Sequence, residues 1–418
     1  MHYLSYLIIL VFTWPIRWLP YPAIHRLGAW LGRAAFHVLK SYRKRALSNL
    51  SMATDLNLQP SDIQRIAKGS LENLMITCLE YPKLASETKI ERIAHCENPE
   101  VADKLMKEGK PVIFFCGHQA NWEILFLEGT NRMPGVAIGR PVKNTYLYRF
   151  VLKMREKFGG KIIAPQNAIK EGLRALKKGC FLGIVGDQGR PDSGYSSPFF
   201  GRLAFTSPIP AILSHRTGSP IIVATTRRAN GRYIIHYSDP IWPNRDAPME
   251  QETDRMMRQC LSVLEESIRQ IPEQWLWVHN RWKLQPINVI KRPFRHESIA
   301  IFFPQDRVSF MDLLSHLPTF RSIYPQESFT LFVPSQFREL VEVKNMEVVP
   351  YDNFSDLLVT DYRFKLIFNF SECSEIKPHF KKQAAFTIVD LNELKDRSQG
   401  LCSSNLSDIL KKAVCHAP

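Results

Sequence analysis

The sequence predicts an α/β protein with N-terminal membrane-associated helices, a central mixed sheet covered by helices, and a smaller C-terminal α/β domain. Three observations lead to this fold class. Strand-length apolar runs alternate with helix-like segments between residues 112 and 271, and a second series of short apolar runs begins near residue 299. The first 54 residues contain basic and apolar residues but neither Asp nor Glu. We therefore expect three parts: residues 1–54, 55–286 and 287–418.

The N-terminal part begins with an uncharged apolar run from Tyr3 to Ile16. This run is short of the roughly 20 residues that span a bilayer as a helix. The next segment, Ala23 to Leu50, has apolar residues near helical spacing with cations between them. We expect an anchor followed by a basic interfacial helix, with the positive flank keeping the main body cytoplasmic. The alternative is an ordinary core helix with a solvated basic face.

The central part predicts a sheet built from βα units, preceded by an amphipathic helix over Ile63 to Leu79. The expected strands are 112–116, 135–138, 161–164, 181–185, 220–225 and 233–237, and the expected helices are 144–158, 167–178, 207–216 and 250–271. Lys291 to Arg295 is interpreted as a linker. Beyond it, we expect the strands of the smaller domain at 299–303, 329–333, 347–350, 364–368 and 385–389.

The composition of the 418-residue chain narrows the classes of function. The net charge of +15 favours an anionic partner, such as a phospholipid surface, a phosphorylated substrate, an acidic protein or nucleic acid. No basic motif interleaved with aromatic residues supports nucleic acid. None of the eight cysteines forms a Cys-x-x-Cys pair, so we expect reduced thiols, no disulfide framework and no zinc or other metal site.

The stretch Val112 to Glu123 contains the most informative motif. A buried strand is expected to end at Cys116, and a helix-like run begins at Asn121, which places His118 and Glu123 at a strand-to-helix turn. Histidine accepts a proton near neutral pH, and a carboxylate holds its tautomer. Because no serine or cysteine completes a triad here, we expect a substrate hydroxyl to be the nucleophile. A buried histidine that is only hydrogen-bonded is the alternative.

Three further residues are candidates for substrate binding. The forked guanidinium of arginine matches phosphate, which makes Arg140 and Arg155 candidates. The alternative for both is an ordinary arginine that solvates a surface. Asp187 follows Gly186 at the end of a predicted strand, where open α/β folds place their sites. A turn or helix-capping role is the alternative for Asp187.

An ordered series of short motifs resembles a known family, the bacterial lipid A biosynthesis late acyltransferases. The motifs are Leu19-Pro-Tyr-Pro22, Leu27-Gly-x-x-Leu-Gly32, Arg45-x-x-x-Asn-Leu50, Gly117-His-Gln-Ala-Asn-Trp-Glu123, Gly139-Arg-Pro141, Arg155-x-x-x-Gly-Gly160, Gly186-Asp-Gln188, Phe199-Phe-Gly201, Arg216-Thr-Gly218 and Glu273-Gln-Trp-Leu-Trp277. This lauroyl- or myristoyl-type family belongs to the glycerolipid acyltransferase superfamily, whose signature is His-x4-Asp/Glu. The resemblance covers roughly residues 15–285, and the remaining tail lies outside it.

The resemblance implies an enzyme of the bacterial inner membrane that works at its cytoplasmic face. Such an enzyme moves a fatty acyl chain from an acyl carrier protein thioester, or less often coenzyme A, to a hydroxyl of a phosphorylated lipid A precursor, without a further cofactor. It makes His118 the general base and Glu123 its orienting partner, and Arg155 and Asp187 match functional positions. The anionic membrane surface is a further expected partner.

Two alternatives to this function stay open from the residues. One is acyl transfer to another glycolipid or to a lysophospholipid, for which the His-x4-Glu motif is unchanged. The other is a basic membrane-associated scaffold in which the His118–Glu123 pair is structural. Because every expected site residue precedes residue 190, we expect residues 1–290 to keep the chemistry without the tail.

Overall fold

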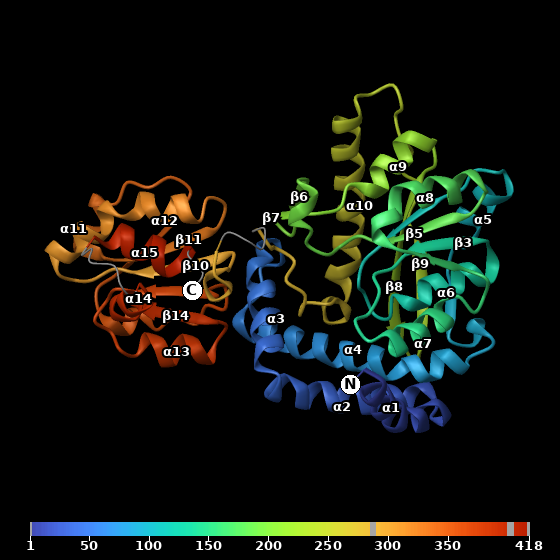
Figure 1. The fold of residues 1–418 in the computed structure, drawn as a ribbon, viewed down its shortest axis with the longest axis horizontal. Coiled ribbons are helices and arrows are strands. Elements are labelled where there is room, and N and C mark those ends of the chain that lie inside the picture. Colours follow the sequence, from blue (N-terminus) through green and yellow to red (C-terminus); the bar gives the residue numbers. More distant parts are fainter. Residues whose placement is uncertain (1, 285–289, 399–404, 416–418) are drawn as a thin grey trace. The chain divides into compact units, whose positions relative to one another are not determined.

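The structure is a computed structural model that describes residues 2–284, 290–398 and 405–415 (Figure 1). It contains two compact units. Unit 1 combines residues 1–39 with 65–281, and unit 2 combines residues 40–64 with 282–418. Residues 40–64 therefore pack with the C-terminal part of the chain, a grouping that the sequence patterns do not reveal.

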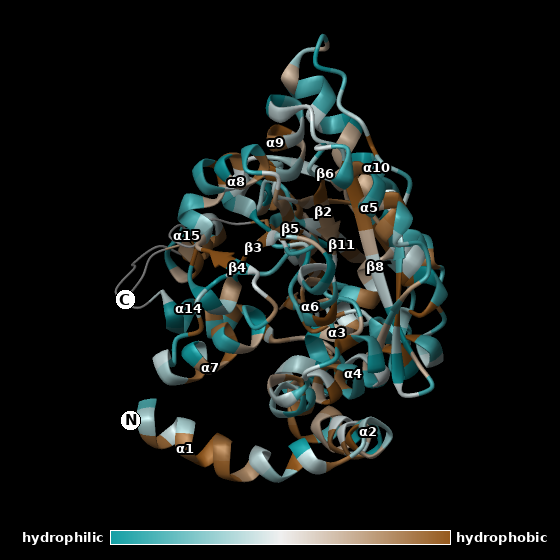
Figure 2. Cartoon of the chain, turned by 90° about the vertical axis from the view of Figure 1, so that its right-hand side faces the viewer, coloured by the Kyte–Doolittle hydropathy of each residue, from teal (hydrophilic) through white to brown (hydrophobic). Residues whose placement is uncertain are grey.

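The N-terminal half of the chain begins with consecutive helices: α1 (His2–Thr13), the 3-10 helix η1 (Trp14–Trp18), α2 (Tyr21–Val38), α3 (Lys40–Met52) and α4 (Pro60–Ser86). The segment expected as one basic helix is broken at Leu39, where the backbone leaves the helical region. Within unit 1, α1 and α2 lie on the side of α4 that faces away from the sheet (Figures 1 and 2). In the described ranges, no helix combines the length and apolar character that crossing a membrane requires.

The centre of unit 1 is a mixed seven-stranded sheet with the order β1-β9-β8-β2-β5-β3-β4. Its strands are β1 (Ala94–Cys96), β2 (Ile113–Cys116), β3 (Gly135–Ile138), β4 (Lys161–Ile163), β5 (Phe181–Val185), β8 (Ile221–Ala229) and β9 (Arg232–Tyr237). All neighbours are parallel except β8 and β9, which form an antiparallel hairpin. The six strands predicted between residues 112 and 237 are confirmed. The short β1 and the hairpin of β6 (Ser196–Phe199) and β7 (Arg202–Phe205) were not predicted.

Helices cover both faces of this sheet, as the predicted α/β layering requires. One face carries α5 (Glu100–Lys107), α6 (Glu123–Arg132) and α7 (Thr145–Arg155), and the other carries α8 (Ala168–Lys177), α9 (Ile209–Thr217) and α10 (Met249–Gln270). β2 is buried along its whole length, with Phe114 and Cys116 in the core beneath α5 and α6. A strand buried on both faces lacks a polar face, which explains its continuous apolar run.

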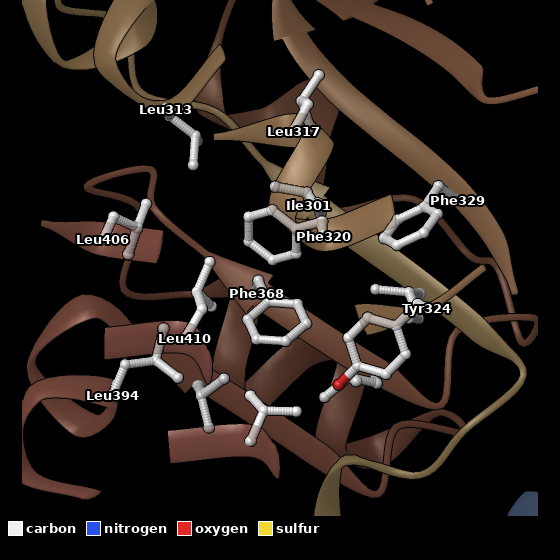
Figure 3. Packing of buried hydrophobic residues seen from close by; sticks show 14 of the residues in the cluster. Ile301, Leu313, Leu317, Phe320, Tyr324, Phe329, Phe368, Leu394, Leu406 and Leu410 are labelled. Carbon is white, nitrogen blue, oxygen red and sulfur yellow. The ribbon is translucent and has the colours of Figure 1, made fainter. Parts of the chain in front are cut away.

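Unit 2 is built on a five-stranded parallel sheet with the order β12-β11-β10-β13-β14. Its strands are β10 (Ser298–Phe302), β11 (Ser328–Pro334), β12 (Glu347–Tyr351), β13 (Leu366–Asn369) and β14 (Thr387–Asp390), and its helices are α11 (Arg307–Ser315), α12 (Leu317–Ile323), α13 (Ile376–Lys382), α14 (Leu391–Arg397) and α15 (Leu406–Cys415). Aromatic side chains such as Phe320 and Phe368 fill the core between sheet and helices (Figure 3). The five strands predicted in the tail are confirmed.

The segment interpreted as a linker, Lys291–Arg295, is instead part of unit 2. Arg292–Phe294 forms a 3-10 helix, and the Phe294 ring is fully buried in the core of that unit. The backbone N–H of Lys291 donates to the carbonyl of Val414 in α15. The charges and the proline suggested a linker because this element is too short to show a periodic pattern.

Two glycines explain the Leu27-Gly-x-x-Leu-Gly32 motif. They bring α2 so close to α4 that a Cβ on Gly28 would lie 2.6 Å from Ile76, and one on Gly32 would lie 2.3 Å from the Cα of Glu72. No ordinary side chain fits such a gap, because the atom opposite Gly32 is backbone.

Replacing Gly32 by leucine is therefore expected to push α2 off α4 and to lower the free energy of unfolding by about 1–3 kcal/mol, the usual cost of overpacking. Chemical denaturation in detergent measures the change. Ala34→Leu, which adds the same side chain to an exposed position of α2, is the control. Equal stability of the two variants would contradict the tight α2–α4 contact.

Candidate functional site

The site is formed where two central strands end side by side. β2 and β5 are parallel and in register, with Cys116 opposite Val185, so Gly117 and Gly186 follow at the same edge of the sheet. The backbone N–H of Gly186 donates to the carbonyl of Cys116 at 3.0 Å. A Cβ on Gly186 would lie 2.2 Å from the Phe115 ring. Small residues at this edge let the next residue of each strand, a histidine and an aspartate, approach each other.

His118 and Asp187 form a doubly hydrogen-bonded pair. Nδ1 of the His118 ring lies 2.6 Å from Oδ1 of Asp187, and the backbone N–H of His118 donates to Oδ2 at 2.7 Å. The imidazole is 14% exposed, whereas the carboxylate is 1% exposed. The ring thus has one nitrogen fixed by a buried carboxylate while its other nitrogen points elsewhere, which is the arrangement of an oriented general base.

The environment of Asp187 keeps its carboxyl group ionised. Burial by itself would raise the pKa, but the charge of His118 and the hydrogen bonds from its ring and backbone lower the pKa to about 2. The indole N–H of Trp275 adds a further hydrogen bond to Oδ2 at 2.7 Å. Arg281 is also fully buried, and burial lowers the pKa of its guanidinium to about 10. The charge of Asp187 acts in the opposite direction and raises that pKa.

The second ring nitrogen of His118 faces a polar group that sequence reasoning did not single out. The side-chain amide nitrogen of Gln188 lies 3.1 Å from Nε2, and the Trp122 ring packs edge-on against the imidazole with centroids 4.5 Å apart. When the ring carries its proton on Nδ1 alone, Nε2 can accept a hydrogen bond from this amide.

Glu123 is placed differently from the sequence-based expectation. Its carboxylate is held by Arg155, whose Nε donates at 2.7 Å, and by the Tyr81 hydroxyl, also at 2.7 Å. The expected orienting contact to His118 is made by Asp187 instead. Glu123 is the first residue of α6, and there its carboxylate meets Tyr81 of α4 and Arg155 of α7.

Charge matching within this second cluster is strong. Burial lowers the pKa of the Arg155 guanidinium, but the charge of Glu123 and the hydrogen bonds to it outweigh that effect and raise the pKa. Burial, followed by the charge of Glu123, raises the pKa of Tyr81 well above its usual range. Arg155 is therefore a charge partner of Glu123 rather than an unoccupied cation.

The loop between His118 and α6 is held by hydrogen bonds to α4 and to the segment around Gln274 and Leu276. Ala120 adopts a left-handed conformation with φ of 48°, which is costly for a residue with a Cβ. Its N–H donates to the carbonyl of Gln274 at 2.6 Å, and its carbonyl accepts from Asn73 and Thr77 of α4. The carbonyl of His118 accepts from Leu276. The Glu273–Trp277 motif thus pairs with the loop that carries His118, a contact that no local pattern predicts.

A buried glutamate joins the N-terminal helices to the same loop. Glu80 of α4 accepts from the amide of Asn121 at 2.7 Å and from the hydroxyl of Tyr233 at 2.6 Å. Its other oxygen lies 2.6 Å from Nε2 of His25, which belongs to α2. The polar network therefore connects α2, α4 and the loop that carries His118.

Arg140 is the predicted site residue that follows β3, the direct neighbour of β5 in the sheet. β5 separates β3 from β2, and Arg140 is exposed. Its neighbour Gly139 lies against Arg155, because a Cβ there would be 3.3 Å from Nη1 of that arginine. The structure thus brings His118 and Asp187 into one cluster, Glu123 and Arg155 into an adjoining one, and leaves Arg140 at the rim. Within the described ranges, no group of three or more His, Cys, Asp or Glu side chains is arranged to hold a metal.

The hydrogen bond from Trp275 gives a prediction about turnover. Trp275→Phe keeps most of the ring but removes the N–H that fixes Asp187, and we expect turnover to fall about tenfold, equivalent to about 1.4 kcal/mol. Trp277→Phe is the matched control, since this indole is equally buried but donates to the backbone carbonyl of Pro272. Steady-state kinetics on both variants at matched thermal stability test this; equal kcat values would show that Trp275 only packs.

Comparison with known proteins places the site in a family context. The family model described as bacterial lipid A biosynthesis acyltransferase matches residues 1–284. The lipid A biosynthesis lauroyltransferase of Escherichia coli K12 is 24% identical over 291 residues, which cover 67% of this chain and 91% of that protein. The lipid A biosynthesis palmitoleoyltransferase of the same strain is 23% identical over 274 residues (64% and 88%). A lipid A biosynthesis acyltransferase of Haemophilus influenzae is 25% identical over 261 residues (60% and 78%).

Proposed function

Because this chain belongs to the bacterial lipid A biosynthesis acyltransferase family, we propose that it transfers a fatty acyl chain from an acyl carrier protein thioester to a hydroxyl group of a lipid A precursor. The observation that carries the proposal is the pair of His118 and Asp187 at the carboxyl ends of β2 and β5. It lies inside the segment that the family model matches, and it has the geometry of an oriented base.

In the proposed reaction, Nε2 of His118 removes the proton of the acceptor hydroxyl as its oxygen attacks the thioester carbonyl. The tetrahedral intermediate then collapses, the C–S bond breaks, and the imidazolium returns the proton to the leaving thiolate. Asp187 keeps the proton of the neutral ring on Nδ1 and stabilises the imidazolium that forms. The acceptor hydroxyl takes the position of the Gln188 amide at Nε2. General-base catalysis of this kind contributes about 10²–10⁴-fold.

The cluster around Glu123 has a positioning role in this proposal. Glu123 ties α6, which follows the catalytic loop, to Arg155 at the end of α7 and to Tyr81 of α4. Since the charge of Arg155 is matched by Glu123, we assign the phosphate of the acceptor to the exposed Arg140 rather than to Arg155. The protein is placed by this proposal on the cytoplasmic face of a bacterial inner membrane, with no cofactor besides the thioester.

The membrane-facing surface is assigned to residues 2–39 of unit 1. Large apolar side chains such as Leu4, Phe12, Trp18 and Trp30 are exposed there, and the segment contains no Asp or Glu. Apolar side chains that insert at the headgroup level, with cations beside them, suit a helix that lies in the surface of an anionic membrane.

The proposed function is tested by an assay with the purified chain, acyl carrier protein charged with a fatty acid, and a tetra-acylated lipid A precursor, followed by mass spectrometry. We expect the mass of one acyl chain to be added to the precursor. Parallel reactions with acyl coenzyme A and with a lysophospholipid acceptor test the donor and the acceptor separately. Acylation of the lysophospholipid alone would overturn the acceptor, and no acylation in any reaction would favour a scaffold.

A further inference from the structure

A pocket of about 400 Å³ lies between α1 with η1, the C-terminal end of α4, and α7. This volume is in the range of small-molecule sites. The walls are mostly apolar, with Ile9 and Leu10 from α1, Ala85 from α4 and Phe150 from α7. The pocket lies within unit 1 and is separate from the pair of His118 and Asp187 in its lining residues. Nothing in the proposed reaction uses it.

The charged groups of the pocket are all cationic. Arg17, Lys153 and Lys157 line it, and none of its lining side chains among the described residues is acidic. Lys157 is engaged with the carbonyls of Leu84 and Glu87 at the end of α4, and burial lowers its pKa to about 8. Lys153, by contrast, makes no hydrogen bond or ion pair with any residue that the structure describes. The pocket therefore combines an apolar interior with unmatched positive charge, which suits a ligand with a hydrocarbon part and an anionic part.

Arg17 is held at the pocket by aromatic rings rather than by a carboxylate. Its guanidinium carbon lies 3.8 Å from the ring centroid of Trp14 and 4.6 Å from that of Trp18. Cation–π contacts orient a guanidinium without neutralising its charge. The guanidinium therefore keeps its full charge at the pocket, and both tryptophans are themselves exposed apolar residues of the kind found at membrane interfaces.

The wall formed by α1 gives the pocket access to a bilayer. No residue of α1 is buried, and its outer side chains, Leu4, Val11 and Phe12 among them, are exposed. Figure 2 shows this helix as a largely hydrophobic segment at the edge of unit 1. It is held near α7 by the amide of Asn144, which donates to the carbonyl of His2 at 2.8 Å and to the Ser5 hydroxyl at 2.9 Å.

The inner end of the pocket adjoins the cluster around Glu123. Pro82 and Met154 line the pocket, and they directly follow Tyr81 and precede Arg155, the two residues that hold Glu123. A chain in this pocket therefore contacts the helices that position Glu123, whereas a reacting acyl chain has to reach Nε2 of His118. The acceptor likewise has to present its hydroxyl at that nitrogen. This separation favours a lipid that does not react.

We propose that this pocket binds one hydrocarbon chain of an anionic phospholipid from the surrounding bilayer, with the phosphate held by Arg17 and Lys153. The bound lipid completes the contact between α1 and the rest of unit 1, in which α1 itself buries no side chain. The proposal rests on the membrane location proposed above but not on the chemistry of acyl transfer.

Photo-crosslinking in vesicles tests the proposal with the full chain. The probe is phosphatidylglycerol with a photoreactive group in its acyl chain, and phosphatidylcholine with the same chain is the headgroup control. We expect labelled peptides from residues 147–154 and 6–17, with phosphatidylglycerol labelling them about tenfold more than phosphatidylcholine, a difference of about 1.4 kcal/mol. Equal labelling by both lipids overturns the assignment of the phosphate. Labelling confined to Tyr3, Leu4, Val11 and Phe12 overturns the pocket, because it shows surface insertion alone.

Two variants test the binding of the lipid's acyl chain and the binding of its headgroup separately. Ala85→Trp fills the apolar interior and is expected to abolish labelling at 147–154, whereas Leu203→Trp, at an exposed position of β7, leaves it unchanged. Lys153→Gln keeps the fold and is expected to remove the preference for phosphatidylglycerol, with Lys170→Gln on the exposed face of α8 as control. Wild-type labelling in both pocket variants would overturn the proposal.

A competition arm distinguishes the two possible sources of an anionic lipid. Adding the tetra-acylated lipid A precursor is expected to leave the labelling of residues 147–154 unchanged; displacement of the probe would show that the acceptor occupies the pocket and would overturn the phospholipid assignment. Absence of all labelling also overturns the proposal. The acyltransferase assay, run on the same preparation, shows whether the proposed function fails with it.

Discussion

Replacing His118 by alanine is expected to lower kcat by about 10²–10⁴-fold while the protein remains folded, because the general base of the proposed reaction is removed. In this variant, the carboxylate of Asp187 keeps its hydrogen bonds from the backbone N–H of residue 118 and from the indole N–H of Trp275, so the edge of the sheet stays held. Acyl transfer measured by mass spectrometry, together with thermal unfolding, separates the loss of chemistry from a loss of structure. His236→Ala, which removes a largely exposed histidine of β9, is the matched control.

Removing the charge of Asp187 and removing the charge of Glu123 are expected to affect kcat and stability differently. Asp187→Asn leaves a side chain of the same shape but removes the charge that stabilises the imidazolium, so kcat should fall by an amount close to that of His118→Ala. Glu123→Gln leaves Arg155 with an unmatched, largely buried charge. We therefore expect Glu123→Gln to lower stability more than Asp187→Asn does, and to lower kcat less. A larger loss of kcat in Glu123→Gln than in Asp187→Asn, at equal stability, would return the orienting role to Glu123.

Most of the sheet in each unit was predictable because strands buried on both faces leave a strong local signal. The runs Ile113–Cys116, Ile299–Phe302 and Leu366–Phe368 are continuous apolar segments of strand length. The missed elements lack that signal. β1 has only three residues, and the hairpin of β6 and β7 carries Ser196, Ser197 and Pro198 within its first strand.

The site itself was predictable only in part, because local spacing does not show which side chains meet. Glu123 was paired with His118 in the sequence-based hypothesis because the two are close in the chain. The contact is made by Asp187, 69 residues away, because the parallel register of β2 and β5 places their ends together. The position of Gly186-Asp-Gln188 at the end of a predicted strand was the one sequence signal that pointed to Asp187. Only the order of the strands in the sheet shows that Asp187 is the carboxylate that orients the ring.

The packing of α3 changes what is expected of a truncated chain. Six residues of α3, from Ala46 to Leu50 and Met52, are buried, and the helix belongs to unit 2. Lys44 and Ser48 donate to the carbonyls of Ala385 and Arg363, which lie in the tail. A chain that ends at residue 290 loses these partners and exposes the apolar face of α3. We therefore expect it to aggregate or unfold without cooperativity and to lose most of its acyl transfer, contrary to the expectation from sequence that residues 1–290 suffice.

The full-length chain allows the same point to be tested without deletion. Lys365, which is 1% exposed, forms an ion pair with the buried Glu297 and a contact of 3.5 Å with Asn49 of α3. Lys365→Met leaves the carboxylate of Glu297 buried without its cation, which costs about 3–5 kcal/mol, whereas adding Glu297→Leu removes that charge and should restore much of the stability. Limited proteolysis reports on α3, and we expect cleavage within residues 40–64 to accelerate in Lys365→Met and to slow again in the double variant. If residues 1–290 instead unfold cooperatively and turn over normally, or if cleavage at α3 is unaffected by Lys365→Met, then α3 does not depend on the tail and the tail contributes nothing to the reaction.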